Sequence, residues 1–483
     1  MKKEEIGLKK IVSNISWSLA EKLLTDAVGL IITIVLARLL FPEDYGDVVL
    51  VQVYINIASI FVGTGLGTAL IQKKDATETQ ISTIFYVNIF VGLILYAIVF
   101  TIAPFLSSIG NNSELCALLR VLAIKIPLAS AYSIQHSYIK KRMQFKRFFY
   151  SSLAGTLVSA VVGISMAYMG FGPWALVASN LVDQVMDMTI LFITTKWFPK
   201  FTVNIKESWT IIKFGLKILV TEFISRTYAQ LRSLIIGIKY STADLAFNSK
   251  GQKFPQMVSD LSDSMITRVM FPVLSESQDD KDRMAYVVKT TIQMSLFILA
   301  PMTIGLAAVS DRFVPLLLTD KWQGVTPYMR VFCVLYLLHP LLAMNSQVIH
   351  ASGRGNLLIK MQTVQTIIGL STIAFVIFVF NTPISISYSL LLTDTINVLI
   401  EMYLSKMLIG YGPIEQIKDI GPTLLISFVM GITVYFVGFL STSNVIGLIL
   451  QIVVGVVIYV GLSLGLKTEP TMFMLRSAKK IRK

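Results

Sequence analysis

Charged residues are scarce in this chain, because only 14% of its 483 residues are charged, whereas 54% are hydrophobic and the mean hydropathy is +0.70. This composition excludes an ordinary soluble domain, in which ~25% of the residues are charged. Charge is absent altogether from residues 81–113, 361–393 and 420–466. Each of these runs is long enough for one or two membrane-spanning helices of ~20 residues. The chain is therefore predicted to be a multi-spanning membrane protein.

The residues that soluble enzymes use for chemistry are also few. The only cysteines are Cys116 and Cys333, and the three histidines, His136, His339 and His350, lack the spacing of metal ligands. Both cysteines fall inside apolar segments, where filling space is a better interpretation than a disulfide or a nucleophile. The chain contains no nucleotide-binding loop of the Gly-x-x-x-x-Gly-Lys-Ser/Thr type. We therefore expect neither an enzyme nor a resident cofactor or metal.

The pattern of apolar segments predicts an all-α fold, since no part of the chain shows the ~10-residue alternation of an outer-membrane barrel. The first helix is expected to be retained, because no small-residue cleavage site follows its charged start. About fourteen membrane helices are predicted, at residues 12–40, 44–70, 81–109, 114–137, 149–169, 173–195, 208–239, 244–273, 284–309, 326–350, 357–380, 384–408, 418–440 and 444–466.

A faint internal repeat organises these helices into two sets of six. Four matches recur at nearly constant separation: Asp44 with Asp244, Ala103-Pro104 with Ala300-Pro301, Arg120 with Arg330, and Asp183 with Asp394. An even number of spans in each repeat predicts two lobes related by a pseudo-twofold axis along the membrane normal, facing one another across a central cavity. The expected divisions are an N-terminal lobe at 1–200, a C-terminal lobe at 201–410, and two extra helices with a basic tail at 411–483.

The distribution of Lys and Arg predicts the orientation. Most of them fall in loops on the side of the two termini, whereas the opposite loops hold only Lys239, Arg312 and Lys321. The positive-inside rule then places both termini in the cytoplasm, and the expected location is the bacterial cytoplasmic membrane. The net charge of +14 is explained by this topology and by contact with lipid headgroups, so nucleic acid is not an expected partner.

Charges inside the apolar segments indicate the candidate site. A charge at bilayer depth costs ~2.5–3.5 kcal/mol on insertion scales, so such residues usually face a cavity, a partner or a substrate. Cations predominate here, which favours an anionic cargo. The candidate substrate-binding cations are Arg226, Lys250, Lys253, Arg232, Lys22, Lys125 and Lys217. The candidate coupling or ion-pairing acids are Asp26, Glu222, Asp183, Asp187, Asp260 and Asp394.

Some of these charges have a structural alternative. Lys22 with Asp26, and Glu222 with Arg226, stand four residues apart on one helical face and can join helices as ion pairs. Lys217 can instead extend its amine to the membrane surface.

Two further pairs are less readily explained as structural. Lys250 and Lys253 lie one turn apart and repel each other unless a polyanion or several acids stand opposite. Asp394 with Glu401, like Asp183 with Asp187, is a candidate proton or sodium site, with service as a counter-ion as the alternative.

Short motifs along most of the chain are similar to those of a known family. They are Leu36-Ala-Arg-Leu-Leu-Phe-Pro-Glu-Asp-Tyr-Gly46, Ala103-Pro-Phe-Leu, Leu119-Arg-Val-Leu-Ala123, Lys141-Arg-Met-Gln-Phe-Lys146, Gly170-Phe-Gly-Pro-Trp-Ala-Leu-Val177, Leu234-Ile-Ile-Gly237, Phe271-Pro-Val-Leu-Ser275 and Asp320-Lys-Trp322. In this order they resemble the polysaccharide transporter family of the multidrug/oligosaccharidyl-lipid/polysaccharide exporter superfamily.

The resemblance implies a Wzx-type flippase. Such a protein moves an undecaprenyl-diphosphate-linked oligosaccharide repeat unit to the outer leaflet by alternating access, for capsule, O-antigen, exopolysaccharide or teichuronic-acid assembly. The implied partners are that lipid-linked oligosaccharide, membrane lipids and glycan-assembly proteins such as the polymerase. The sequence leaves open whether a gradient of H⁺ or Na⁺ or consumption of the product outside drives transport. The alternatives are a lipid II flippase, a cation or drug antiporter of the same superfamily, and a non-transporting scaffold.

Overall fold

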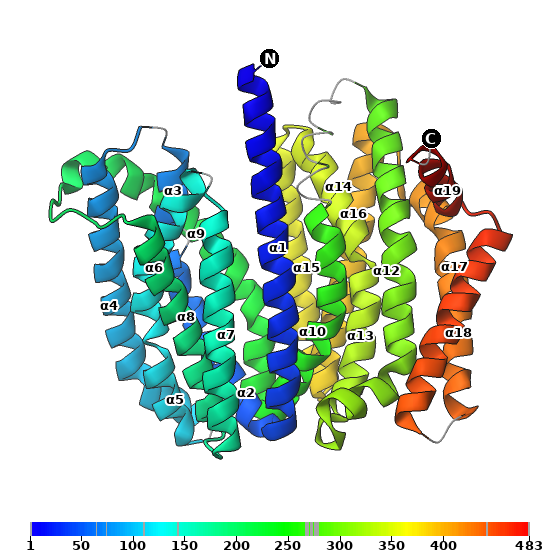
Figure 1. Ribbon diagram of the computed structural model, residues 1–483, viewed down its shortest axis with the longest axis horizontal. Coiled ribbons are helices and arrows are strands. Elements are labelled where there is room, and N and C mark those ends of the chain that lie inside the picture. The colour runs from blue at the N-terminus through cyan, green and yellow to red at the C-terminus, as the bar shows by residue number, and fades with distance from the viewer. Residues whose placement is uncertain are drawn as a thin grey trace. The chain divides into compact units, whose positions relative to one another are not determined.

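The computed structural model describes residues 2–481 except for 64, 74, 110–111, 143, 266–269, 271–273, 275–279 and 441–442. Over the described residues it consists of helices joined by short turns, with no strand (Figure 1). The chain forms two compact units, Met1–Ala246 and Phe247–Lys483. The all-α prediction is confirmed. The motif at 271–275 and the end of the eighth predicted span lie outside the described residues, apart from Met270 and Leu274.

Unit 1 is a bundle of long helices with two shorter ones. Its helices are α1 (Lys2–Leu39), α2 (Pro42–Gly63), α3 (Gly65–Gln72), α4 (Glu78–Ile109), α5 (Glu114–Leu122), α6 (Lys125–Lys141), α7 (Lys146–Tyr168), α8 (Pro173–Thr195) and α9 (Ile205–Lys239). Helix α10 (Thr242–Met265) begins in unit 1 and continues into unit 2. Two predicted spans are thus each built from two helices, α2 with α3 and α5 with α6.

Small residues let the helices of unit 1 approach closely, as is usual where lipid rather than water surrounds the bundle. On α7 the buried residues recur every fourth position, at Ser151, Gly155, Ser159, Gly163 and Ala167. This stripe packs on α8, and a Cβ on Gly155 would lie 3.0 Å from the backbone oxygen of Asp183. The α7 and α8 backbones are therefore in near contact beside a carboxylate.

A second close approach brings α9 against α3. A Cβ on Gly65 would lie 2.5 Å from the backbone oxygen of Gly215, and Phe61 packs on Phe223 with ring centroids 5.2 Å apart. Helix α9, the seventh predicted span, therefore packs within unit 1, against α2, α3 and α4.

Unit 2 contains the rest of α10 and the helices that follow. They are α12 (Lys281–Leu318), α13 (Val325–Leu337), α14 (His339–Ala351), α15 (Gly355–Val379), α16 (Pro383–Ile409), α17 (Pro413–Val437), α18 (Asn444–Gly465) and α19 (Glu469–Ile481), with the 3-10 turns Asp320–Trp322 and Gly438–Leu440. Its main apolar core joins α12, α14 and α16 through Val288, Ile292, Met344, Val398 and Met402. At one end, Lys289 of α12 pairs with Asp419 of α17 at 3.0 Å and with Glu469 of α19 at 3.4 Å.

Eleven helical segments of the described chain are long and apolar enough to cross a membrane. The three predicted spans outside this set correspond to α1, α9 and α10, which carry many of the candidate charges. The eleven segments together with α1, α9 and α10 agree with the prediction of about fourteen membrane helices. The charged residues of α1, α9 and α10 make these three helices less apolar than the other eleven. The divisions predicted at residues 200 and 410, and the central cavity, stay predictions.

Candidate functional site: a polar cavity in unit 1

A cavity of about 540 Å³ lies among α2, α3, α6, α8 and α9 of unit 1, and we call it the polar cavity. It contains five of the thirteen charged residues predicted from the sequence: Lys125, Asp183, Asp187, Glu222 and Arg226. The other residues that line it are Gly63, Thr68, Ile71, Ala129, Tyr132, Ser133, His136, Ser137, Lys140 and Gln184. Cations and acids from three helices thus share one space.

Lys125 is held at the first turn of α6 by amide groups. Its Nζ donates to Asn180 Oδ1 on α8 at 3.3 Å, and Gln52 Nε2 on α2 donates to the same oxygen at 3.1 Å. Gln184 Nε2 donates to the Lys125 backbone oxygen at 3.1 Å. The ammonium group is also close enough to Asp183 for electrostatic attraction. These contacts fix the cation while leaving it on the cavity wall.

Asp183 and Asp187 are separated by one turn of α8, so their carboxylates lie on the same face and repel each other. The Thr156 hydroxyl lies near Asp183, and the hydroxyls of Tyr132 and Ser151 lie near Asp187. Asp187 Oδ1 is buried without a hydrogen-bond partner among the described residues. This oxygen is available to accept a proton or a cation.

Glu222 and Arg226 form a salt bridge within α9. Arg226 Nε donates to Glu222 Oε2 at 2.7 Å, and the two side chains are 55% and 39% exposed, respectively. Exposure this large makes the pair weak as a structural element, since surface ion pairs contribute ~0–1 kcal/mol. A guanidinium held in this way still has free donor groups for an anion.

Aromatic rings form the wall of the cavity next to α7. The His136 ring lies between those of Tyr132 and Phe148, with centroid distances of 5.1 Å and 4.2 Å and interplanar angles of 38° and 39°. Tyr132, His136 and Lys140 were not among the site residues predicted from the sequence. Their spacing could have revealed them, because Tyr132, His136 and Lys140 follow one another at intervals of four residues on α6 and therefore lie on one face.

The other predicted residues of α1 and α9 lie outside the lining of the polar cavity. Lys22 and Asp26 are both half-buried on α1, whereas Lys217 is exposed. Arg232 is buried, and its Nη2 donates to the Tyr228 hydroxyl at 3.2 Å.

The remaining four belong to unit 2. Lys250 is buried on α10, Lys253 is exposed three residues later, and Asp260 is half-buried. Asp394 is half-buried on α16. The structure therefore gathers one group of candidates and leaves the others on separate elements.

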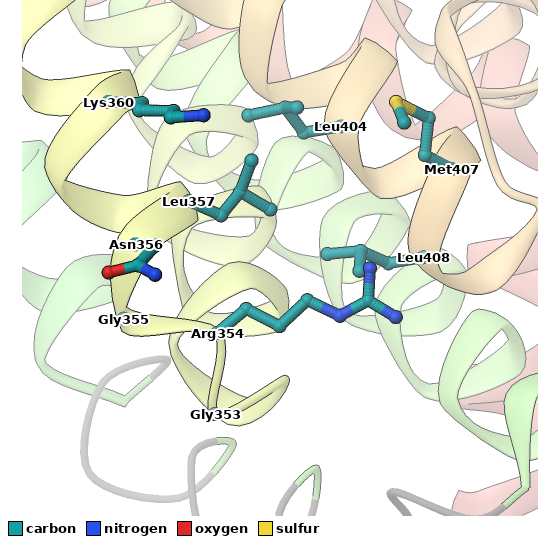
Figure 2. Close-up of a pocket in the computed structure, with 9 residues that line it drawn as sticks. All are labelled: Gly353, Arg354, Gly355, Asn356, Leu357, Lys360, Leu404, Met407 and Leu408. Atoms are coloured by element: carbon teal, nitrogen blue, oxygen red, sulfur yellow. The ribbon is translucent and has the colours of Figure 1, made fainter.

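A second cavity, of about 560 Å³, lies between α15 and α16 in unit 2 (Figure 2). Arg354 and Lys360 extend from the α15 side toward Leu404, Met407 and Leu408 of α16. Its described lining contains two cations and no acid. The polar cavity is the stronger candidate site because it combines cations, acids and amides on several helices.

Metal binding finds no support in the parts of the chain that are described. No group of three or more His, Cys, Asp or Glu side chains in these parts is arranged to hold a metal ion.

Comparison with known proteins gives a family match. The family described as "Polysaccharide biosynthesis protein" matches residues 35–327. The chain is 23% identical over 445 residues to the teichuronic acid biosynthesis protein TuaB of Bacillus subtilis, covering 90% of each chain. It is also 23% identical over 322 residues to the succinoglycan biosynthesis transport protein ExoT of Rhizobium meliloti, covering 67% of this chain and 65% of ExoT.

Solved structures share the fold. The lipid II flippase MurJ in an inward closed conformation matches 93% of this chain and 98% of its own, with a TM-score of 0.75 and 16% identity. An inward-facing multidrug resistance MATE family transporter matches 80% of this chain and 94% of its own, with a TM-score of 0.62 and 14% identity.

Proposed function

We propose, from the premise that this chain belongs to the polysaccharide biosynthesis protein family, that it is a flippase for undecaprenyl-diphosphate-linked oligosaccharide repeat units. The chain is a multi-pass membrane protein and a transporter of the multidrug/oligosaccharidyl-lipid/polysaccharide exporter superfamily, not an enzyme. The repeat unit serves the assembly of a cell-surface polysaccharide. The protein works in the cytoplasmic membrane with both termini in the cytoplasm, as its Lys and Arg distribution predicts.

The observation that carries this proposal is the set of cations around the polar cavity. A diphosphate entering a low-dielectric space needs donor groups that replace its lost hydration, and Lys and Arg provide charge-assisted hydrogen bonds for this purpose. Lys125, Lys140 and Arg226 line the cavity from two helices. In our proposal these cations bind the diphosphate, while the amides and hydroxyls nearby contact the sugar.

The acids of the polar cavity have a different role in this proposal. Asp183 and Asp187 compete with an anionic cargo for Lys125 and Arg226, and each changes its affinity for these cations when it binds a proton or Na⁺. Binding of the coupling ion therefore frees cations for the cargo. By linkage, the cargo favours binding of the coupling ion in the same proportion.

The remaining candidates complete the proposed transport path. Lys22, Arg232, Lys250, Lys253 and Lys217 would meet the cargo in other states of the alternating cycle. Asp26, Glu222, Asp260 and Asp394 would serve as their counter-ions or as coupling sites.

The experiment that tests the function is depletion of the protein in its host, followed by measurement of where lipid-linked oligosaccharides accumulate. We expect completed repeat units to accumulate on the cytoplasmic leaflet, and Arg226→Ala or Lys250→Ala to reproduce this at normal protein level. The control is Lys206→Ala, an exposed cation of α9 that does not line the polar cavity.

Each alternative function predicts a different result. Accumulation of lipid II would indicate a peptidoglycan-precursor flippase, and altered resistance to cationic compounds with unchanged lipid pools would indicate an antiporter. A scaffold would lose folding yield in the two variants without a selective defect in transport.

A further inference from the structure

Glu401 is a buried carboxylate of α16 with no cationic partner among the described residues. Its side chain is only 4% exposed, in the interior of unit 2. Its Oε1 accepts a hydrogen bond from Gln365 Nε2 of α15 at 2.9 Å, while its Oε2 is buried without a hydrogen-bond partner. A neutral amide cannot compensate a buried negative charge, so this group must either hold a proton or bind a cation.

The surroundings of Glu401 favour a proton. Asn397 and Ser405 stand one turn before and one turn after it, on the same face of α16. Asn397 Oδ1 and Ser405 Oγ are also buried without a hydrogen-bond partner among the described residues. A protonated Glu401 has an O–H group that can donate a hydrogen bond. The unpartnered amide oxygen and hydroxyl oxygen on this face can accept such a bond.

No described cation opposes this assignment. Among the charged groups, the one that acts electrostatically on Glu401 is Asp394, an acid on the same helix. Helix α16 packs against α12, α13, α14, α15 and α17, whose other charged or titratable groups include Lys289, Arg330, His339, His350, Lys360 and Asp419. Of these, Lys289 is paired with Asp419, and Arg330 with Asp311. A nearby acid disfavours a second negative charge at Glu401.

We propose that Glu401 is a proton-binding site in unit 2, and that loss of its proton loosens the packing of α15 on α16. The link to transport rests on the function proposed above, whereas proton binding itself does not. The Gln365 to Glu401 hydrogen bond joins the two helices, as does the one between Thr372 and Thr393 at 2.7 Å. An ionised Glu401 would have to draw water between the helices to be solvated. Protonation therefore favours the packed arrangement, and deprotonation favours a more open one.

The test is infrared difference spectroscopy of the purified full-length protein in lipid nanodiscs, titrated through neutral pH. Wild-type protein should show the carbonyl-stretch band of a protonated carboxylic acid at neutral pH, and Glu401→Gln should remove it. Gln has the same shape and can still pair with Gln365. The matched control is Glu43→Gln, the same chemical change at an exposed position of α2, which should leave the band in place.

Asp394→Asn tests whether the band comes from Asp394 instead. If the band disappears in Asp394→Asn but not in Glu401→Gln, the proton belongs to Asp394 and the proposal is overturned. A band that is unchanged by Glu401→Gln would show that Glu401 is ionised. A band that forms only after sodium is removed would show that the site holds a metal cation, which also overturns the proposal.

The coupling step has a separate readout. Glu401→Gln should weaken the dependence of oligosaccharide export on external pH, whereas export by Glu43→Gln should keep the pH dependence of the wild-type protein. If Glu401→Gln removes the carboxylic acid band but the wild-type protein exports no lipid-linked oligosaccharide, the proton site is supported and the proposed function is refuted. Export that keeps the wild-type pH dependence in Glu401→Gln would refute the coupling.

Discussion

The acids of the polar cavity of unit 1 and Glu401 of unit 2 differ in burial and in their partners, because Asp183 and Asp187 are half-buried whereas Glu401 is buried. In the cavity, Asp183 and Asp187 share space with Lys125 and Arg226. In unit 2, Glu401 has one neutral amide as its partner. Opposite charges that share a cavity can exchange partners with a charged cargo, whereas a buried carboxyl group beside a neutral amide can change its charge only by binding a proton or a cation. The comparison separates a place suited to binding cargo from a place suited to sensing protons.

The largest loss of export should come from Lys125→Met. This substitution removes the fixed cation of the polar cavity and leaves the length of the side chain nearly unchanged. A hydrogen bond to a charged group is worth ~1.5–3 kcal/mol, so we expect export to fall roughly 10- to 100-fold. The measurement is the rate at which lipid-linked oligosaccharide reaches the outer leaflet, at equal protein level. Lys206→Met is the control, and equal rates in the two variants would remove Lys125 from the site.

The close packing of α3 on α9, two helices that line the polar cavity, can be tested at Gly65. A Cβ there meets the backbone of Gly215 at 2.5 Å, so Gly65→Ala should push α3 away from α9 and destabilise the protein by ~1–3 kcal/mol. Gly63→Ala is the matched control, because nothing lies within 4 Å of its Cβ position. Thermal unfolding in detergent measures both. Equal melting temperatures would show that the α3–α9 contact is not tight.

The Glu222–Arg226 pair distinguishes binding from structure. As a half-exposed pair it should contribute only ~0.2–1 kcal/mol to stability, so the exchange Glu222→Arg with Arg226→Glu should leave the melting temperature nearly unchanged. Export should nevertheless fall, because the cation has moved one turn along α9. Full export by the exchanged protein would favour a purely structural ion pair.

The smallest effect is expected at the ionic cluster of unit 2. Glu469 is 67% exposed, and its 3.4 Å contact with Lys289 is longer than the 3.0 Å contact from Asp419. Glu469→Gln should therefore change the free energy of unfolding by at most ~0.5 kcal/mol. Asp419→Asn should cost more, since Asp419 is only 19% exposed and accepts a hydrogen bond from the Tyr411 hydroxyl at 2.9 Å. Burial and this carboxylate raise the pKa of Tyr411, which keeps it a donor. A larger loss in Glu469→Gln would reverse this order.

Local patterns in the chain predicted the helices well. Long runs without charge specify membrane helices because a lipid-surrounded backbone must satisfy its own hydrogen bonds, and α4, α15 and α18 follow directly from such runs. The separation of four residues between Glu222 and Arg226 predicted their ion pair. Residues four apart in a helix are neighbours on one face whatever the rest of the fold is.

Partners on different helices were beyond the reach of the sequence. Asn180, which accepts a hydrogen bond from Lys125, lies 55 residues away from it along the chain. Gln52, which donates to Asn180, lies 128 residues away from Asn180. The meeting of α3 with α9 at Gly65 and Gly215 likewise depends on packing between distant segments.

The sequence by itself determined that this is a helical membrane protein with costly charges inside its apolar segments, because composition and local periodicity carry that information directly. The tertiary structure decided which of those charges share a cavity and which is sealed away. Asp183 and Asp187 line a cavity together with Lys125 and Arg226, whereas Glu401 is buried and accepts a hydrogen bond from the neutral amide of Gln365. Burial and partners depend on which helix faces cover each other, and that is a property of the packed bundle.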